Sequence, residues 1–277
     1  MTSRMKSCVT IALVPSIRTG PWIYWDDLEA GMQKAATLGF DAVELFTAST
    51  DAIAPNQLTA LGEQYNLAIA AVGTGAGKVM HGLTLTDPDP AVRAKARQFI
   101  QDMIEFGAQV QAPAIIGSMQ GNAAPTASRQ QALDWLAEGL NQLGDYAERQ
   151  GVPLIYEPLN RYETNLINRL DDGVALLTTL ATRNVRLLAD LFHMNLEEAS
   201  LPDSIRSAGT AIGHVHFADS NRRPVGFGHT EMNGIVEALT EIGYGGYISA
   251  EAFPWPDPDA AAEQTIRAYQ QYFVSSH

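Results

Sequence analysis

Four side chains that can bind a metal ion stand at the ends of four consecutive short apolar segments: Glu157, Asp190, His216 and Glu251. Apolar segments seldom carry charge at matching positions, because a buried charge without a partner is costly. Three carboxylates brought together would repel one another and raise one another's pKa values, and a divalent cation would remove that repulsion. The pattern therefore predicts a metal site, with a network of salt bridges as the alternative. Three oxygen donors and one imidazole suit one Mn²⁺ ion, with Mg²⁺ or Co²⁺ as alternatives, better than a thiolate-rich zinc site.

Other polar residues lie close to these four positions in the sequence. Glu163, His193 and Arg222 each follow a metal-capable residue by three to six positions and are predicted in loops above the metal. A substrate's hydroxyls would lie there, although each of the three can also be a solvent-exposed loop residue. His214, two residues before the metal-capable histidine, is expected to be a buried, hydrogen-bonded core histidine. The role of Glu44 is left open: it could contact the substrate or pair with a buried cation.

The elements that must position these residues alternate between short apolar runs and longer amphipathic runs. The apolar runs predict eight strands: Cys8–Val14, Ala42–Phe46, Leu67–Gly73, Ala112–Gly117, Val152–Glu157, Val185–Leu191, Ile212–Ala218 and Gly246–Glu251. The amphipathic runs predict helices: Trp25–Leu38, Pro55–Tyr65, Pro90–Phe106, Ser128–Gln150, Leu170–Ala181, Asp203–Ala208, Met232–Ile242 and Asp259–Phe273. The glycines of 73–77 are expected to lead into a long loop.

This alternation predicts an α/β protein with a parallel sheet, because strands joined by helical crossovers run in the same direction. Eight strand–helix units in a chain of this length favour a single (β/α)8 TIM barrel, in which chemistry takes place where the strands end. The alternative is an open doubly wound sheet, but the first strand–helix turn has no G-x-G-x-x-G motif.

The composition excludes several classes of partner. No linker, low-complexity tract or charge block divides the 277 residues, so we expect one domain over residues 1–277. The 18 basic and 31 acidic side chains give a formal net charge of −13, which makes nucleic acid and anionic membranes poor partners. The single cysteine, Cys8, suits a reducing compartment, and no apolar run approaches the ~18 residues of a membrane span. We therefore expect a soluble, cytoplasmic protein.

Four segments around the metal-capable residues resemble the xylose-isomerase-like TIM-barrel superfamily of sugar isomerases and epimerases: Glu157–Asn168, Asp190–Asn195, His214–Arg222 and Ala250–Phe253. The resemblance is greatest to the D-tagatose 3-epimerase and D-psicose 3-epimerase group. The first of the four segments is similar to that group's fifth-strand motif over its whole length. The similarity spans most of the barrel and is strongest in the second half.

The resemblance implies roles for the residues named above. The four metal-capable side chains would be the ligands of one divalent ion. Glu157 and Glu251 would also form the catalytic acid/base pair, while Glu163, His193 and Arg222 would hold the O1 and O2 end of a small sugar. The family also implies a homo-oligomer, either a dimer or a tetramer. Substrate identity is left open, because segments 14–18 and 115–122 differ from the parts of the ketohexose epimerases that grip the distal end of the sugar.

The implied reaction is epimerisation of a ketose or keto-sugar. One glutamate would remove the C3 proton to give an enediolate, and the other would return a proton to the opposite face. Enzymes with the same ligands offer alternatives: an aldose–ketose or hydroxypyruvate-type isomerase, or an inosose-dehydratase-like lyase. The non-enzyme alternative is a sugar-binding barrel.

Two further alternatives are disfavoured by the residues themselves. A metal-independent glycosidase also uses two carboxylates, but it has no need of Asp190 and His216. Endonuclease IV, in the same superfamily, needs a zinc cluster richer in histidine and a basic surface for DNA. The six histidines and acidic charge of this chain argue against that activity.

Overall fold

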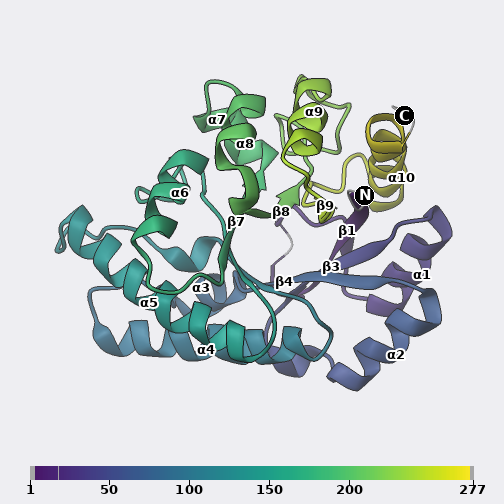
Figure 1. The fold of residues 1–277 in the computed structure, drawn as a ribbon. Coiled ribbons are helices and arrows are strands. Elements are labelled where there is room, and N and C mark those ends of the chain that lie inside the picture. The colour runs from purple at the N-terminus through teal and green to yellow at the C-terminus, as the bar shows by residue number, and fades with distance from the viewer. Residues whose placement is uncertain (1–3, 18, 275–277) are drawn as a thin grey trace.

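A closed barrel of parallel strands surrounded by helices forms the centre of the protein (Figure 1). The computed structural model describes residues 4–17 and 19–274. In this part of the chain the strands are β1 (Lys6–Leu13), β2 (Tyr24–Trp25), β3 (Ala42–Thr47), β4 (Ala68–Gly73), β5 (Ala114–Ile116), β6 (Leu154–Tyr156), β7 (Val185–Asp190), β8 (Ile212–His216) and β9 (Tyr247–Ala250). β1 pairs with both β3 and β9, which closes the barrel, and the short β2 pairs with β1 alone. The predicted (β/α)8 barrel is confirmed.

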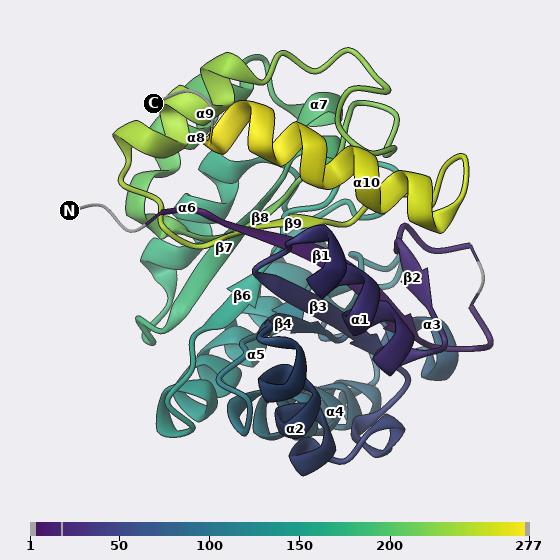
Figure 2. The ribbon, with the colours of Figure 1, turned by 90° about the vertical axis from the view of Figure 1, so that its right-hand side faces the viewer.

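The helices pack their apolar faces on the outside of the barrel. They are α1 (Leu28–Leu38), α2 (Pro55–Tyr65), α3 (Ala76–His81), α4 (Pro90–Ala108), α5 (Arg129–Arg149), α6 (Leu170–Thr179), α7 (Leu191–Glu197), α8 (Leu201–Ala208), α9 (Asn233–Glu241) and α10 (Pro258–Tyr269). Figure 2 shows β1 and β9, from opposite ends of the chain, side by side beneath α10. Within the described residues, no helix combines the length and the apolarity that crossing a membrane requires.

The barrel interior is filled below the site. Ala71, Ile115, Ile155 and Leu188 come from four neighbouring strands and form one buried apolar cluster inside the barrel. Such a layer of inward-facing side chains makes the barrel a packed core rather than a channel. The polar residues at the strand ends therefore lie above a closely packed apolar layer.

Three local predictions are wrong. The helix expected from Trp25 begins only at Leu28, because Trp25 pairs with β1 and the side chain of Asp27 caps the first turn. The segment after Gly73 forms the short helix α3 instead of a long loop. The strand expected to reach Leu191 ends at Asp190, and α7 starts at once, so His193 lies on a helix rather than in a loop.

Candidate metal centre

The barrel brings the four metal-capable residues together. Asp190 and His216 are the last residues of β7 and β8, while Glu157 and Glu251 directly follow β6 and β9. One ligand atom from each lies within 4.8 Å of those of the other three, and all four side chains are buried. His216 Nδ1 is 3.2 Å from Asp190 Oδ2, 3.4 Å from Glu157 Oε1 and 3.6 Å from Glu251 Oε2. The strand-end pattern in the sequence therefore corresponds to one cluster in space.

Asp190 caps a helix and faces the cluster at the same time. Its Oδ1 accepts hydrogen bonds from the backbone N–H groups of Phe192 (2.7 Å) and His193 (3.0 Å), which begin α7. This fixes the carboxylate and leaves Oδ2 directed at His216. Burial raises the pKa of Asp190, but the electrostatic influence of His193, the hydrogen bond and charge of His216 and the charge of Arg222 outweigh it and hold that pKa well below its usual range. Asp190 therefore stays a carboxylate.

The position of the Glu157 carboxylate depends on the absence of a side chain at Gly117 beside it. A Cβ atom at Gly117 would lie 2.3 Å from Glu157 Oε2, so a larger residue there would displace the carboxylate. Burial, the largest influence, and the charge of Glu251 raise the pKa of Glu157 to about 7, against the opposing effects of His216 and His193. Its Oε1 is buried and has no hydrogen-bond partner among the described residues.

These features fit a divalent cation. A buried carboxylate oxygen without a partner is costly unless something positive meets it. Burial lowers the pKa of His216, but the surrounding carboxylates, with Glu44 and Glu251 foremost, raise it well above its ordinary value. The cluster thus favours positive charge at its centre. Three carboxylates with one imidazole form a donor set that suits Mn²⁺, Mg²⁺ or Co²⁺.

His193 points a proton donor at the cluster. Its Nδ1 accepts a hydrogen bond from the backbone N–H of Asn160 (3.3 Å), so the ring proton is on Nε2. The Asn160 side-chain amide also lies 2.7 Å from Nδ1. Nε2 is buried, without a hydrogen-bond partner among the described residues, and lies 3.8 Å from both Glu157 Oε1 and Asp190 Oδ2. Asn160 was not predicted, although it lies inside the motif of residues 157–168.

Arg222 and Glu163 complete the polar side of the site. Arg222 Nη2 donates a hydrogen bond to Glu251 Oε2 (2.5 Å), and its Nη1 is 3.5 Å from Glu163 Oε1. Arg222 has a left-handed φ of 59° in a loop that Asp219 organises. The Asp219 carboxylate accepts hydrogen bonds from four backbone N–H groups of that loop, those of Ser220, Gly226, Gly228 and Thr230. Asp219 was also missed in the sequence.

The cluster opens into a cavity of about 300 Å³. Its lining includes the predicted residues Glu157, Glu163, His193, His216, Arg222 and Glu251. The uncharged part of its lining includes the apolar side chains of Val14, Ile17, Trp22, Phe46 and Val79 together with hydroxyl side chains. Segment 14–18 contributes no aromatic wall through its described residues, but Trp22 supplies an aromatic side chain a few positions later; Arg18 lies outside the described residues. This volume is at the small end of the range for ligand pockets.

His214, which was expected to be a core histidine, and Glu44, whose role was left open, contact each other. His214 is buried and hydrogen-bonded to Glu44, as expected for a core histidine. Glu44 has no exposed surface and also contacts His216. Burial raises the pKa of Glu44, but the charges and hydrogen bonds of the two histidines hold it well below the usual range. Glu44 thus pairs with imidazole groups rather than lining the cavity.

Known proteins resemble the chain over most of its length. The family model of the xylose isomerase-like TIM barrel matches residues 32–272. The D-psicose 3-epimerase of Agrobacterium fabrum is 32% identical over 244 residues, which cover 86% of this chain and 80% of the relative. The L-ribulose 3-epimerase of Methylomonas sp. is 29% identical over 89% of this chain and 87% of its own. A solved structure of D-psicose 3-epimerase with D-tagatose from Clostridium cellulolyticum H10 has a TM-score of 0.79 at 25% identity, covering 98% of this chain and 99% of the other.

Proposed function

Since the chain belongs to the xylose isomerase-like TIM barrel family, we propose that it is a divalent-metal-dependent epimerase of a ketose or keto-sugar. It is an enzyme of the isomerase class, as its named relatives are. The observation that supports the proposal most is the pair of buried glutamates, Glu157 and Glu251, in one cluster with Asp190 and His216. We further propose that residues 1–277 form one domain and that the protein is a homo-oligomer, a dimer or a tetramer.

The proposed metal ligands are Glu157, Asp190, His216 and Glu251, and the proposed ion is Mn²⁺, with Mg²⁺ or Co²⁺ as alternatives. When bound, the ion would polarise the substrate's ketone and stabilise the negative charge that develops on oxygen as the neighbouring carbon loses its proton. Because three carboxylates supply most of the donors, the site would also favour a divalent ion over a monovalent one.

The chain's own residues would move and place the proton. Glu157 and Glu251 follow β6 and β9, two strands that are separated by β7 and β8, so they approach the cavity from different directions. One would take the C3 proton, and the other would return a proton to the opposite face, which inverts the carbon. The Nε2–H of His193 would donate a hydrogen bond to a substrate oxygen. Arg222 and Glu163, on the same side of the cavity, would hold the O1 and O2 end.

The cavity supports a substrate of monosaccharide size. Among the described residues, its acidic, basic and imidazole side chains all belong to the cluster or lie beside it, and the remaining lining is uncharged. A small sugar whose ketone and adjacent hydroxyl face the cluster would satisfy this division, because polar groups fix orientation while apolar walls supply contact area. The proposed substrate class is therefore a ketose or keto-sugar, bound by its carbonyl end.

Turnover in D2O tests this function. With Mn²⁺ present and a panel of ketoses, we expect deuterium at C3 of an accepted ketose, an unlabelled C1 and the C3 epimer as product. NMR and mass spectrometry of the sugars would locate the label. Label at C1 with an aldose as product would contradict the proposal in favour of an aldose–ketose isomerase, and loss of water would indicate a lyase. No exchange with any member of the panel would favour a sugar-binding barrel.

Loss of a proposed ligand should weaken metal binding. We expect His216→Ala and Asp190→Asn each to reduce the bound Mn²⁺ substantially, because the remaining carboxylates then repel one another with fewer donors to hold the ion. Elemental analysis after gel filtration measures the metal content. His229→Ala and Asp134→Asn, at exposed positions outside the cluster, serve as matched controls. Metal content equal to that of the unmutated chain in both ligand variants would show that the site is elsewhere.

A further inference from the structure

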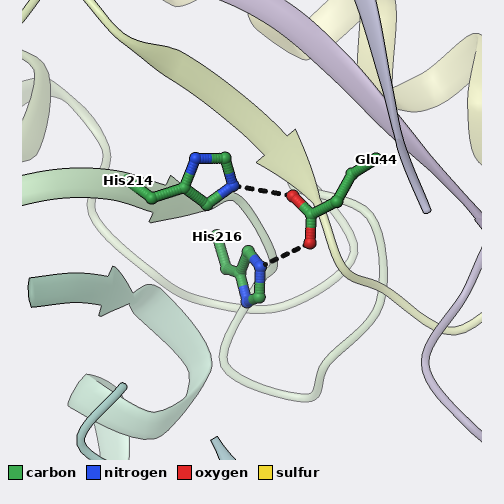
Figure 3. Close-up of side chains that lie close together, drawn as sticks. All are labelled: Glu44, His214 and His216. Carbon is green, nitrogen blue, oxygen red and sulfur yellow. Dashed lines mark hydrogen bonds and ion pairs between the residues drawn. The ribbon is translucent and has the colours of Figure 1, made fainter. Parts of the chain in front are cut away.

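A buried carboxylate joins the two histidines of strand β8 from across the barrel. Glu44 on β3 places Oε2 2.7 Å from His214 Nε2 and Oε1 3.1 Å from His216 Nε2 (Figure 3). All three side chains are almost completely inaccessible to solvent. The two imidazole rings meet edge to face, with centroids 5.5 Å apart, and each directs its Nε2 at a different oxygen of the carboxylate. Both oxygens of Glu44 are therefore occupied by imidazole nitrogens.

This contact decides which nitrogen of His216 is available to a metal. A carboxylate only accepts hydrogen bonds, so the His216 nitrogen that faces Glu44 must carry the proton. His216 Nε2 is that nitrogen, and Nδ1 is the one that faces Asp190, Glu157 and Glu251. Nδ1 also faces a carboxylate and can carry a proton while no ion is bound, but an ion that displaces this proton leaves a neutral imidazole with its proton on Nε2, held by Glu44, and its lone pair on Nδ1. The lone pair then points into the four-residue cluster.

Glu44 does not line the cavity, and its contact with the four-residue cluster is through His216. Its neighbours Phe46 and Thr47 on β3 line the cavity, but Glu44 is not among the described residues that do so. Glu44 is not one of the four grouped residues, and the group that it forms with the two histidines is joined to them by His216, which belongs to both groups. Its separations of 2.7 and 3.1 Å are ordinary hydrogen-bond lengths, so its two oxygens are already used by imidazole N–H groups.

We propose that Glu44 is a positioning residue that fixes the tautomer and orientation of His216, so that Nδ1 is prepared to bind the divalent ion. His214 holds the second oxygen of Glu44 and so fixes the direction of the carboxylate. Carboxylates behind metal-binding histidines act in this way in other sites, and their loss weakens metal affinity or activity by about 10- to 100-fold. The inference rests on the proposed function, because it takes His216 as a ligand of that ion.

A pair of matched variants tests the effect on affinity. Glu44→Gln keeps the size of the side chain but removes its charge, and it can no longer accept from both histidines. We expect Mn²⁺ to bind this variant about 10- to 100-fold more weakly than the unmutated chain. Glu63→Gln, an exposed glutamate on α2, should bind normally. Titration with Mn²⁺, followed by the signal of the free ion in electron paramagnetic resonance, measures the affinity, and circular dichroism of metal-free protein confirms that each variant is folded. Unchanged affinity in Glu44→Gln would overturn the inference.

A second measurement needs no variant to fold. In the full chain with ¹⁵N-labelled histidine and Zn²⁺ as a diamagnetic probe, NMR should show His216 with its proton on Nε2 and the metal on Nδ1. This signature tests which nitrogen binds the metal, because Zn²⁺ on Nδ1 leaves Nε2 as the only ring nitrogen that can carry the proton. Folded Glu44→Gln should show the signature only at about 10- to 100-fold higher Zn²⁺ concentration, whereas a Glu44 with no influence on His216 would leave that concentration unchanged. A proton on Nδ1, or a second Zn²⁺ bound by Glu44, His214 and His216, would overturn the inference. If the unmutated chain bound neither Mn²⁺ nor Zn²⁺, the proposed function would be overturned as well. If the unmutated chain bound them and Glu44→Gln bound them with the same affinity, this inference alone would be overturned.

Discussion

Removal of the divalent ion is expected to abolish turnover of an accepted ketose, and Mn²⁺, Co²⁺ or Mg²⁺ added to the metal-free protein is expected to restore it. A proton on carbon next to a ketone is too weak an acid for a carboxylate alone to remove quickly. A bound cation stabilises the charge that forms in the transition state by several kcal/mol, so its removal should lower the rate by roughly 10³-fold or more. The rate of product formation, measured after dialysis against a chelator and then against chelator-free buffer, tests this.

The control for this experiment is the fold of the metal-free protein. The cluster without a cation leaves Glu157 Oε1 without a partner and places three carboxylates around His216, so some loss of thermal stability is expected. Circular dichroism at the assay temperature separates unfolding from loss of catalysis. Full activity of folded protein that elemental analysis shows to be free of metal would contradict the proposed function. It would then favour a reaction carried out by the two glutamates alone.

Much of the barrel could be predicted because its signals are local. The helix over residues 55–65 was predicted with its observed bounds, since Pro55 occupies the first turn and Asn66 ends the helix in a left-handed conformation. Each strand is a short apolar run that the sequence displays directly. Helices α3 and α7 were missed because they have six and seven residues, which is too short for an amphipathic period to be visible.

The candidate site, too, was predicted only in part. Its four acidic or imidazole side chains were found because strand ends in a barrel meet at one face, which makes sequence position informative about space. Asn160 and Asp219 were missed because their roles depend on contacts that spacing does not reveal. Asn160 contacts a histidine 33 positions later, and Asp219 accepts its hydrogen bonds from loop backbone groups, which carry no residue signal. The role of Gly117 could not be predicted from the sequence either, because it consists of leaving space for the Glu157 carboxylate.

Replacement of either proposed acid/base residue by its amide is expected to abolish net epimerisation. Glu157→Gln and Glu251→Gln keep the side-chain volume, but an amide cannot take up or deliver the C3 proton. Inversion needs proton transfer on both faces, so each variant should lose at least ~10²- to 10⁴-fold in the rate of epimer formation. Because both residues are also proposed ligands, the rates should be measured at Mn²⁺ concentrations that saturate each variant. Glu63→Gln again serves as the control.

Exchange in D2O then separates the two faces of the substrate. Each variant retains one carboxylate, so each should exchange the C3 proton of at most one of the two epimers, and the two variants should differ in which epimer they label. This pattern would follow from their placement after β6 and β9, which have β7 and β8 between them on the barrel. If the amide variants lost activity only because the ion was lost, saturating Mn²⁺ would restore epimerisation in both. Epimerisation at the normal rate in either saturated variant would show that the glutamate concerned binds the ion but does not transfer the proton.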